Sequence, residues 1–112
     1  MVAGARVPET AEVLKGTGVE VATVLDFPTT GVMSGYGKAK EVEELVRLGA
    51  TQIDIGVQIG WLKDGDDDRF REDIAAVVAC GVPIKVIMEL PLLTEDEKKA
   101  AVELAVEAGP SR

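Results

Sequence analysis

A charged side chain stands inside each of two apolar segments whose residues alternate with a period of two. Residues 52–59 place Asp54 opposite a row of isoleucine and valine side chains, and residues 83–90 do the same with Lys85 and Glu89. Successive side chains of a strand point to opposite faces, so these charges occupy the polar face of their strands. A carboxylate beside an ammonium can transfer protons or form a purely structural ion pair. Both interpretations stay open at this point.

The chain offers few other reactive groups. It has no histidine, which excludes His-based catalytic triads, His-metal sites and imidazole acid–base catalysis. Its single cysteine, Cys80, cannot form an intramolecular disulfide and does not support a thiolate metal site, so we expect a buried core residue. Any catalytic group must therefore be a carboxylate, a lysine, Tyr36 or a backbone amide. We expect neither a metal nor a cofactor.

The composition narrows the class of partner. The 20 acidic and 12 basic residues give a net charge of −8, which disfavours nucleic-acid binding because contacts to phosphates need clustered Lys and Arg. No apolar run approaches the roughly 18 residues of a membrane span, and the chain starts without a separate charged segment of the signal-peptide type. We therefore expect a cytoplasmic protein that binds no membrane. With 112 residues, the chain is sized for one domain, residues 1–112.

Two further motifs suggest ligand sites, but neither matches the full pattern that its ligand requires. Residues 31–38 contain the glycines and lysine of a phosphate cradle, yet the P-loop spacing is missing, so we predict a flexible strand-to-helix loop. Residues 64–68 carry aspartates at calcium-loop spacing, but Arg69 stands where the loop needs glycine. These aspartates are predicted to stabilise a helix N-terminus instead. Trp61 and Tyr36 are isolated, and we expect both to have packing roles.

Helix and strand patterns alternate along the whole chain. The predicted elements, in chain order, are a helix over 8–15, a strand over 19–26, a helix over 34–48, the strand with Asp54, a helix with its buried stripe within 70–78, the strand with Lys85, and a helix opened by a capping box at 94–97. This alternation predicts an α/β fold with parallel strands and right-handed crossovers. In a parallel barrel, helices cover one face and the other face lines the active site. Asp54 and Lys85 should therefore lie together, opposite the helices.

Five segments resemble the deoxyribose-phosphate aldolase family, in the order in which that family has them. They are residues 21–28 (VATVLDFP), 49–60 (GATQIDIGVQIG), 62–65 (LKDG), 72–74 (EDI) and 85–94 (KVIMELPLLT). The resemblance covers nearly the whole chain and implies about half of a (βα)8 barrel. It also implies reversible aldol cleavage of 2-deoxyribose 5-phosphate to acetaldehyde and glyceraldehyde 3-phosphate through a lysine Schiff base, without a metal.

The resemblance further implies roles for the two strand charges. Asp54 matches an aspartate of the fourth barrel strand that takes part in proton relay, and Lys85 matches a fifth-strand lysine lining the same site. Two departures, Thr29-Thr30 in place of His-Gly and Gln58 in place of Asn, affect details of the pocket. In the family, the sixth strand carries the Schiff-base lysine, and this chain ends where that strand should begin. We therefore expect the chain to be inactive alone, and whether it is itself an enzyme stays open.

Two alternatives from other classes of function remain. A half-barrel could be a structural or assembly module that forms a homo-oligomer through exposed sheet edges. A small α/β domain could instead bind an anion with the glycine loop at 31–37. In the parent enzyme, the expected partner is a small phosphorylated sugar or aldehyde.

Overall fold

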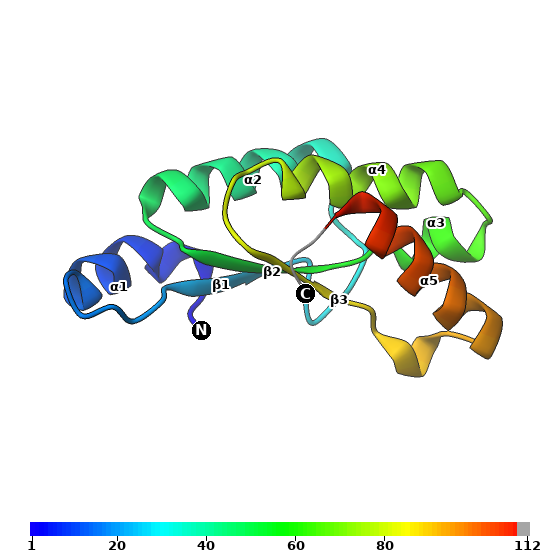
Figure 1. Ribbon diagram of the computed structural model, residues 1–112, viewed down its shortest axis with the longest axis horizontal. Coiled ribbons are helices and arrows are strands. Elements are labelled where there is room, and N and C mark those ends of the chain that lie inside the picture. The colour runs from blue at the N-terminus through cyan, green and yellow to red at the C-terminus, as the bar shows by residue number, and fades with distance from the viewer. Residues whose placement is uncertain (110–112) are drawn as a thin grey trace.

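Three parallel strands with helices between them form the framework of the molecule (Figure 1). The structure is a computed structural model and describes residues 1–109. The strands β1 (Ala22–Leu25), β2 (Gln52–Gly56) and β3 (Ile84–Ile87) lie in this order across the sheet. The helices are α1 (Val7–Leu14), α2 (Gly35–Leu48), α3 (Ile59–Lys63), α4 (Asp67–Val78) and α5 (Glu95–Ala108), with single 3-10 turns η1 (Gly4–Arg6) and η2 (Leu90–Leu92). The predicted α/β class with parallel strands is confirmed.

The two faces of the sheet have different surroundings. Helices α2 and α4 cover one face, whereas no helix within residues 1–109 covers the opposite face, which we call the open face (Figure 1). The aliphatic side chains of the strands point toward the helices, and those that are buried are Leu25, Ile53, Ile55 and Ile84. From the helices, the core receives Val42, Leu45, Phe70, Ile74 and Val77. Helical and strand periodicity together therefore account for the core.

Side-chain caps begin the three longer helices. Ser34 accepts a hydrogen bond from the amide of Gly37 at the start of α2, and Asp66 accepts one from the amide of Arg69 at the start of α4. In α5, Thr94 and Glu97 form a reciprocal capping box. The capping box and the helix-stabilising role of the acidic run are both as predicted.

All three predicted strands are too long. The strand expected over 19–26 is confined to Ala22–Leu25. The strand expected over 52–59 ends at Gly56, because the chain turns into the short helix α3, whose first residue is Ile59. The strand expected over 83–90 ends at Ile87, and Glu89 has a left-handed backbone with φ of 55°. Glu89 therefore does not lie on the strand face that carries Lys85.

Tyr36 was expected to pack, but it is 76% exposed.

The edges of the sheet differ from each other. On the outer side of β1, Val2 forms a parallel bridge with Thr23, and its amide donates to the carbonyl of Ala22 at 3.0 Å. Within residues 1–109, β3 has β2 as its only strand neighbour. The expectation of two unpaired edges is thus correct only for β3. None of the helices in this part of the chain is long and apolar enough to cross a membrane.

The loop after β1 packs on Gly56 so closely that a side chain cannot fit. A Cβ atom there would lie 2.1 Å from the carbonyl oxygen of Asp26 and 2.8 Å from the methyl group of Thr30. We expect Gly56→Ala to lower the free energy of unfolding by about 2 kcal/mol or more, because backbone must move. In the control Gly60→Ala, the added methyl meets nothing within 4 Å and should not destabilise the protein. Urea unfolding followed by circular dichroism compares the two, and equal midpoints would contradict the prediction.

Candidate active site

Asp54 and Lys85 lie side by side on the open face. The two residues are direct partners in the register of β2 and β3, and Lys85 Nζ is 3.8 Å from Asp54 Oδ2. Gln52 Nε2 donates a long hydrogen bond of 3.3 Å to Asp54 Oδ1. The prediction that both charges point to the same side of neighbouring strands, opposite the helices, is confirmed. The alternation of each strand positions them, since in-register residues of parallel strands project in the same direction.

The two members of the pair differ in solvent exposure. The side chain of Asp54 is 4% exposed, whereas that of Lys85 is 53% exposed. Lys85 is therefore not desolvated, because the open face leaves the ammonium in contact with water. A separation of 3.8 Å is an ion pair without a tight hydrogen bond. The ammonium is thus free to reorient toward a ligand on the open face.

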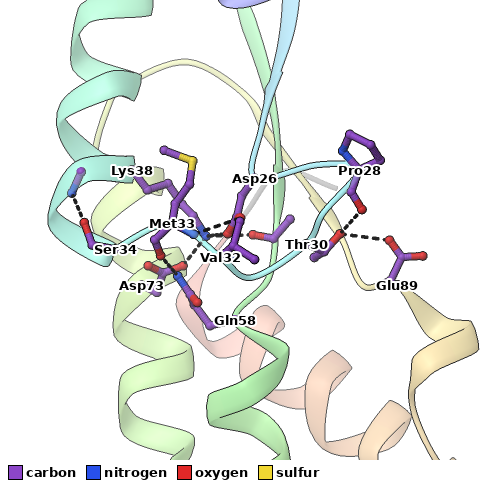
Figure 2. A network of polar contacts seen from close by, with 12 residues as sticks. Asp26, Pro28, Thr30, Val32, Met33, Ser34, Lys38, Gln58, Asp73 and Glu89 are labelled. Carbon is purple, nitrogen blue, oxygen red and sulfur yellow. Dashed lines mark hydrogen bonds and ion pairs between the residues drawn. The ribbon is translucent and has the colours of Figure 1, made fainter.

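A second group of charges, the buried charge cluster of Asp26, Lys38 and Asp73, lies at the carboxyl ends of the strands (Figure 2). Lys38 Nζ is 2.9 Å from Asp26 Oδ2 and 2.8 Å from Asp73 Oδ2, and it donates to the carbonyl of Gly56 at 2.9 Å. The contacts to Asp73 Oδ2 and to the Gly56 carbonyl are hydrogen bonds, whereas the contact to Asp26 Oδ2 is an ion pair without hydrogen-bond geometry. Each side chain is at most 1% exposed, so the charges depend on one another for compensation.

The loop that follows β1 is organised by Asp26 and does not form an anion cradle. Asp26 Oδ1 accepts hydrogen bonds from the amides of Val32 at 2.8 Å and Met33 at 3.2 Å. These amides are therefore already occupied by a carboxylate, and the nearby Lys38 is wholly buried in its ion pairs. The arrangement argues against the alternative of anion binding by residues 31–37.

The same loop ties the ends of the three strands together (Figure 2). Thr30 Oγ1 donates to Glu89 Oε2 at 3.0 Å, which connects the loop with the segment after β3. Gln58 Nε2, just beyond β2, donates to the carbonyl of Met33 at 2.7 Å. The loop thus fixes the carboxyl ends of the strands, which is the edge where parallel barrels carry their active sites.

The sequence contained a signal for the buried charge cluster that the prediction missed. Lys38 stands four residues before Val42 and seven before Leu45, so it continues the buried stripe of α2. Asp73 stands next to Ile74 and three residues after Phe70, on the buried stripe of α4. Opposite charges in the apolar stripes of two helices indicate an interior ion pair. Within residues 1–109, no group of three Cys, Asp or Glu side chains is arranged to hold a metal ion.

Comparison with curated proteins finds relatives along most of the chain. The chain is 46% identical over 102 residues to the deoxyribose-phosphate aldolase of Geobacillus sp. (strain WCH70) and 40% identical over 99 residues to that of Thermosynechococcus vestitus. Each match covers 88% of this chain and 45% of the relative. The chain therefore spans about half the length of the curated relatives it matches. No protein-family profile matches it.

Solved structures agree with these relatives. A structure from Coccidioides immitis described as a deoxyribose-phosphate aldolase superposes with a TM-score of 0.92 at 31% identity, covering 97% of this chain and 44% of that one. An aldolase designated QR15 gives a TM-score of 0.89 at 33% identity, covering 97% and 49%. The deoxyribose-phosphate aldolase of Aeropyrum pernix, described as tetrameric, shares the fold at 20% identity with a TM-score of 0.82. The predicted fold, about half of a parallel βα barrel, is confirmed.

Lys38→Met would remove the ammonium that lies between two buried carboxylates. We expect this substitution to lower the free energy of unfolding by about 3–5 kcal/mol, because it leaves buried charges without compensation. Lys40→Met is the matched control on the same helix, where the side chain is 54% exposed, and should change stability by about 0.5 kcal/mol at most. Urea unfolding measures both variants. A comparable loss in both would show that the buried charge cluster does not hold the structure together.

Proposed function

We propose that this chain, a relative of the deoxyribose-phosphate aldolases that spans about half their length, supplies the acid–base pair of that enzyme. The reaction is the reversible aldol cleavage of 2-deoxyribose 5-phosphate to acetaldehyde and glyceraldehyde 3-phosphate. The observation that carries the proposal is the pairing of Asp54 with Lys85 on the open face, 3.8 Å apart on neighbouring strands. We also propose a cytoplasmic location, because the free thiol of Cys80 is compatible with a reducing compartment.

In this proposal, Asp54 moves protons at a Schiff base formed by another lysine. That lysine adds to the aldehyde carbon of the open-chain sugar, and loss of water gives an iminium ion. As the C2–C3 bond breaks, Asp54 takes the proton of the C3 hydroxyl group and releases glyceraldehyde 3-phosphate. Asp54 then returns the proton to C2 of the remaining enamine, and water frees acetaldehyde and the lysine. Lys85 balances the charge of the carboxylate and holds it in place.

Lys85 is not the nucleophile in this scheme. A Schiff base forms from the neutral amine, whereas Lys85 faces the carboxylate of Asp54 and is half exposed to water. The Lys85 amine is thus already engaged in the ion pair with Asp54. The resemblance assigns the nucleophile to the next barrel strand, which is not among the three strands described above.

A segment exchange tests the proposed function. Replacing the matching segment of the Geobacillus enzyme by this chain should give a chimera that cleaves 2-deoxyribose 5-phosphate. In the chimera, Asp54→Asn should lower kcat by about 100-fold or more, since it removes the group that transfers protons. Lys85→Met should also lower kcat, because it removes the ammonium that holds the Asp54 carboxylate in place. Lys99→Met, an exposed lysine of α5, is the control and should keep full activity. A folded chimera whose turnover is unaffected by Asp54→Asn would overturn the assigned role.

The isolated chain is expected to show neither turnover nor a Schiff base. Borohydride reduction in the presence of 2-deoxyribose 5-phosphate, followed by mass spectrometry of tryptic peptides, detects a trapped lysine. A stoichiometric adduct on Lys85 that is lost in Lys85→Met would show that the chain carries its own nucleophile.

We also propose that two copies of the chain associate through the free edge of β3. Unpaired backbone groups on a sheet edge favour pairing with another strand, and a two-fold axis would join β3 of one copy to β3 of the other. We expect sedimentation velocity to report a concentration-dependent dimer. Ile87→Lys should raise the dissociation constant of the dimer by about tenfold, because it places a charge at the sheet edge. Val102→Lys, on the exposed face of α5, should leave that constant unchanged. A monomer at all concentrations would contradict the proposal.

A further inference from the structure

A cavity lies on the helix side of the molecule, away from the open face. It opens between α2, α3 and α4 and has a volume of about 330 Å³. Tyr36 and Trp61 contribute aromatic walls, Ala39 and Ala76 contribute methyl groups, and Glu72 and Asp73 are the acidic residues of the lining. This size is within the range of small-molecule sites in proteins. The proposed aldolase chemistry uses none of these residues.

The floor of the cavity carries negative charge from the buried charge cluster. Two carboxylates face one ammonium there, so the cluster has a formal charge of −1. Asp73 Oδ1 has no hydrogen-bond partner within the described residues, although its side chain is only 1% exposed. This oxygen points toward Gly35, which also lines the cavity, since a Cβ atom on Gly35 would lie 3.1 Å from it. The charge therefore lies just beneath the cavity surface.

The aromatic walls already attract cations of the chain itself. Arg69 Cζ is 5.8 Å from the ring centroid of Trp61, and Lys40 Nζ is 5.6 Å from that of Tyr36. Arg69 is balanced by Asp66, whose Oδ2 lies 3.3 Å from Arg69 Nε. Glu72 is exposed at the rim and adds negative charge to that of the floor. Arg69 also lines the cavity, but its charge is balanced by Asp66, so Glu72 and the buried charge cluster leave the surroundings of the cavity net negative, which favours a cation beside the aromatic walls.

We propose that this cavity binds the quaternary ammonium group of a small molecule. The unpartnered oxygen of Asp73 is covered, so it contributes charge to the site without offering an accessible hydrogen-bond acceptor. A primary ammonium would lose hydrogen bonds to water on entering and could regain them from a lining carboxylate only at Glu72 on the rim. A trimethylammonium group has no N–H to satisfy, and its methyl groups fit apolar and aromatic walls. The structure therefore favours the methylated cation over the primary one.

The only tryptophan of the chain is Trp61, so intrinsic fluorescence reports directly on the cavity. The full chain is titrated at constant ionic strength with choline, with the uncharged isostere of choline in which carbon replaces nitrogen, and with ethanolamine. We expect a saturable response to choline with a dissociation constant at least about fivefold lower than for either of the others. Equal binding of the uncharged isostere would show that the cavity recognises only the apolar shape of the ligand and would overturn the proposal. Equal binding of ethanolamine, or no saturable response, would also overturn it.

Matched variants locate the binding. Tyr36→Leu should weaken choline binding by about fivefold, and because Tyr36 is 76% exposed, the fold should tolerate the change. Glu72→Gln should weaken choline binding. Glu103→Gln, the control, removes a charge of the same sign from the exposed face of α5 and should leave choline binding unchanged. Equal weakening by both glutamate variants would show that choline senses only the net charge. Circular dichroism verifies that each variant is folded, and none of these readouts depends on aldolase activity.

Discussion

The position of one ammonium group governs the arrangement of the elements around the candidate site. Lys38 Nζ binds a carboxylate at the end of β1, a carboxylate from α4 and the last carbonyl of β2, while its own backbone belongs to α2. Four elements therefore meet at a single buried charge. A buried ion pair can cost more in desolvation than it returns in stability, yet it tolerates only one geometry. We infer that the cluster specifies how the helices dock on the strands and where the strand ends lie.

The carboxyl ends of the strands are further fixed by the loop that Asp26 begins. That loop lies against Gly56, where a glycine is required because the carbonyl of Asp26 occupies the space of a side chain. It then reaches Glu89 through Thr30 (Figure 2). Because the amides of Val32 and Met33 bind the carboxylate of Asp26, the glycines and lysine of this loop resemble a phosphate cradle without forming one. The register of β2 and β3 in turn places Asp54 beside Lys85.

The two sides of the sheet separate two kinds of chemistry. On the open face, the half-exposed ammonium of Lys85 lies beside the buried carboxylate of Asp54. On the helix side, the excess carboxylate of the buried charge cluster gives a negative floor to an aromatic cavity. The sheet lies between them, so a ligand in the cavity does not compete for the open face. Each site depends on the same cluster, through position in one case and through charge in the other.

The sequence by itself determined the elements and the side to which their charges point. Alternation in β2 and β3 was enough to predict the face on which Asp54 and Lys85 lie. Helical spacing and the capping box at Thr94 were enough to predict α2, α4 and α5, because these patterns are local in the sequence. The same alternation overextended two strands, since Ile59 and Glu89 keep the pattern after the backbone has turned. Only the tertiary structure decided that Lys38 is buried and that Lys85 is exposed. Lys38 is buried by partners distant in sequence, Asp26 and Asp73. Lys85 lies on the open face, which no helix within residues 1–109 covers, and its side chain is 53% exposed.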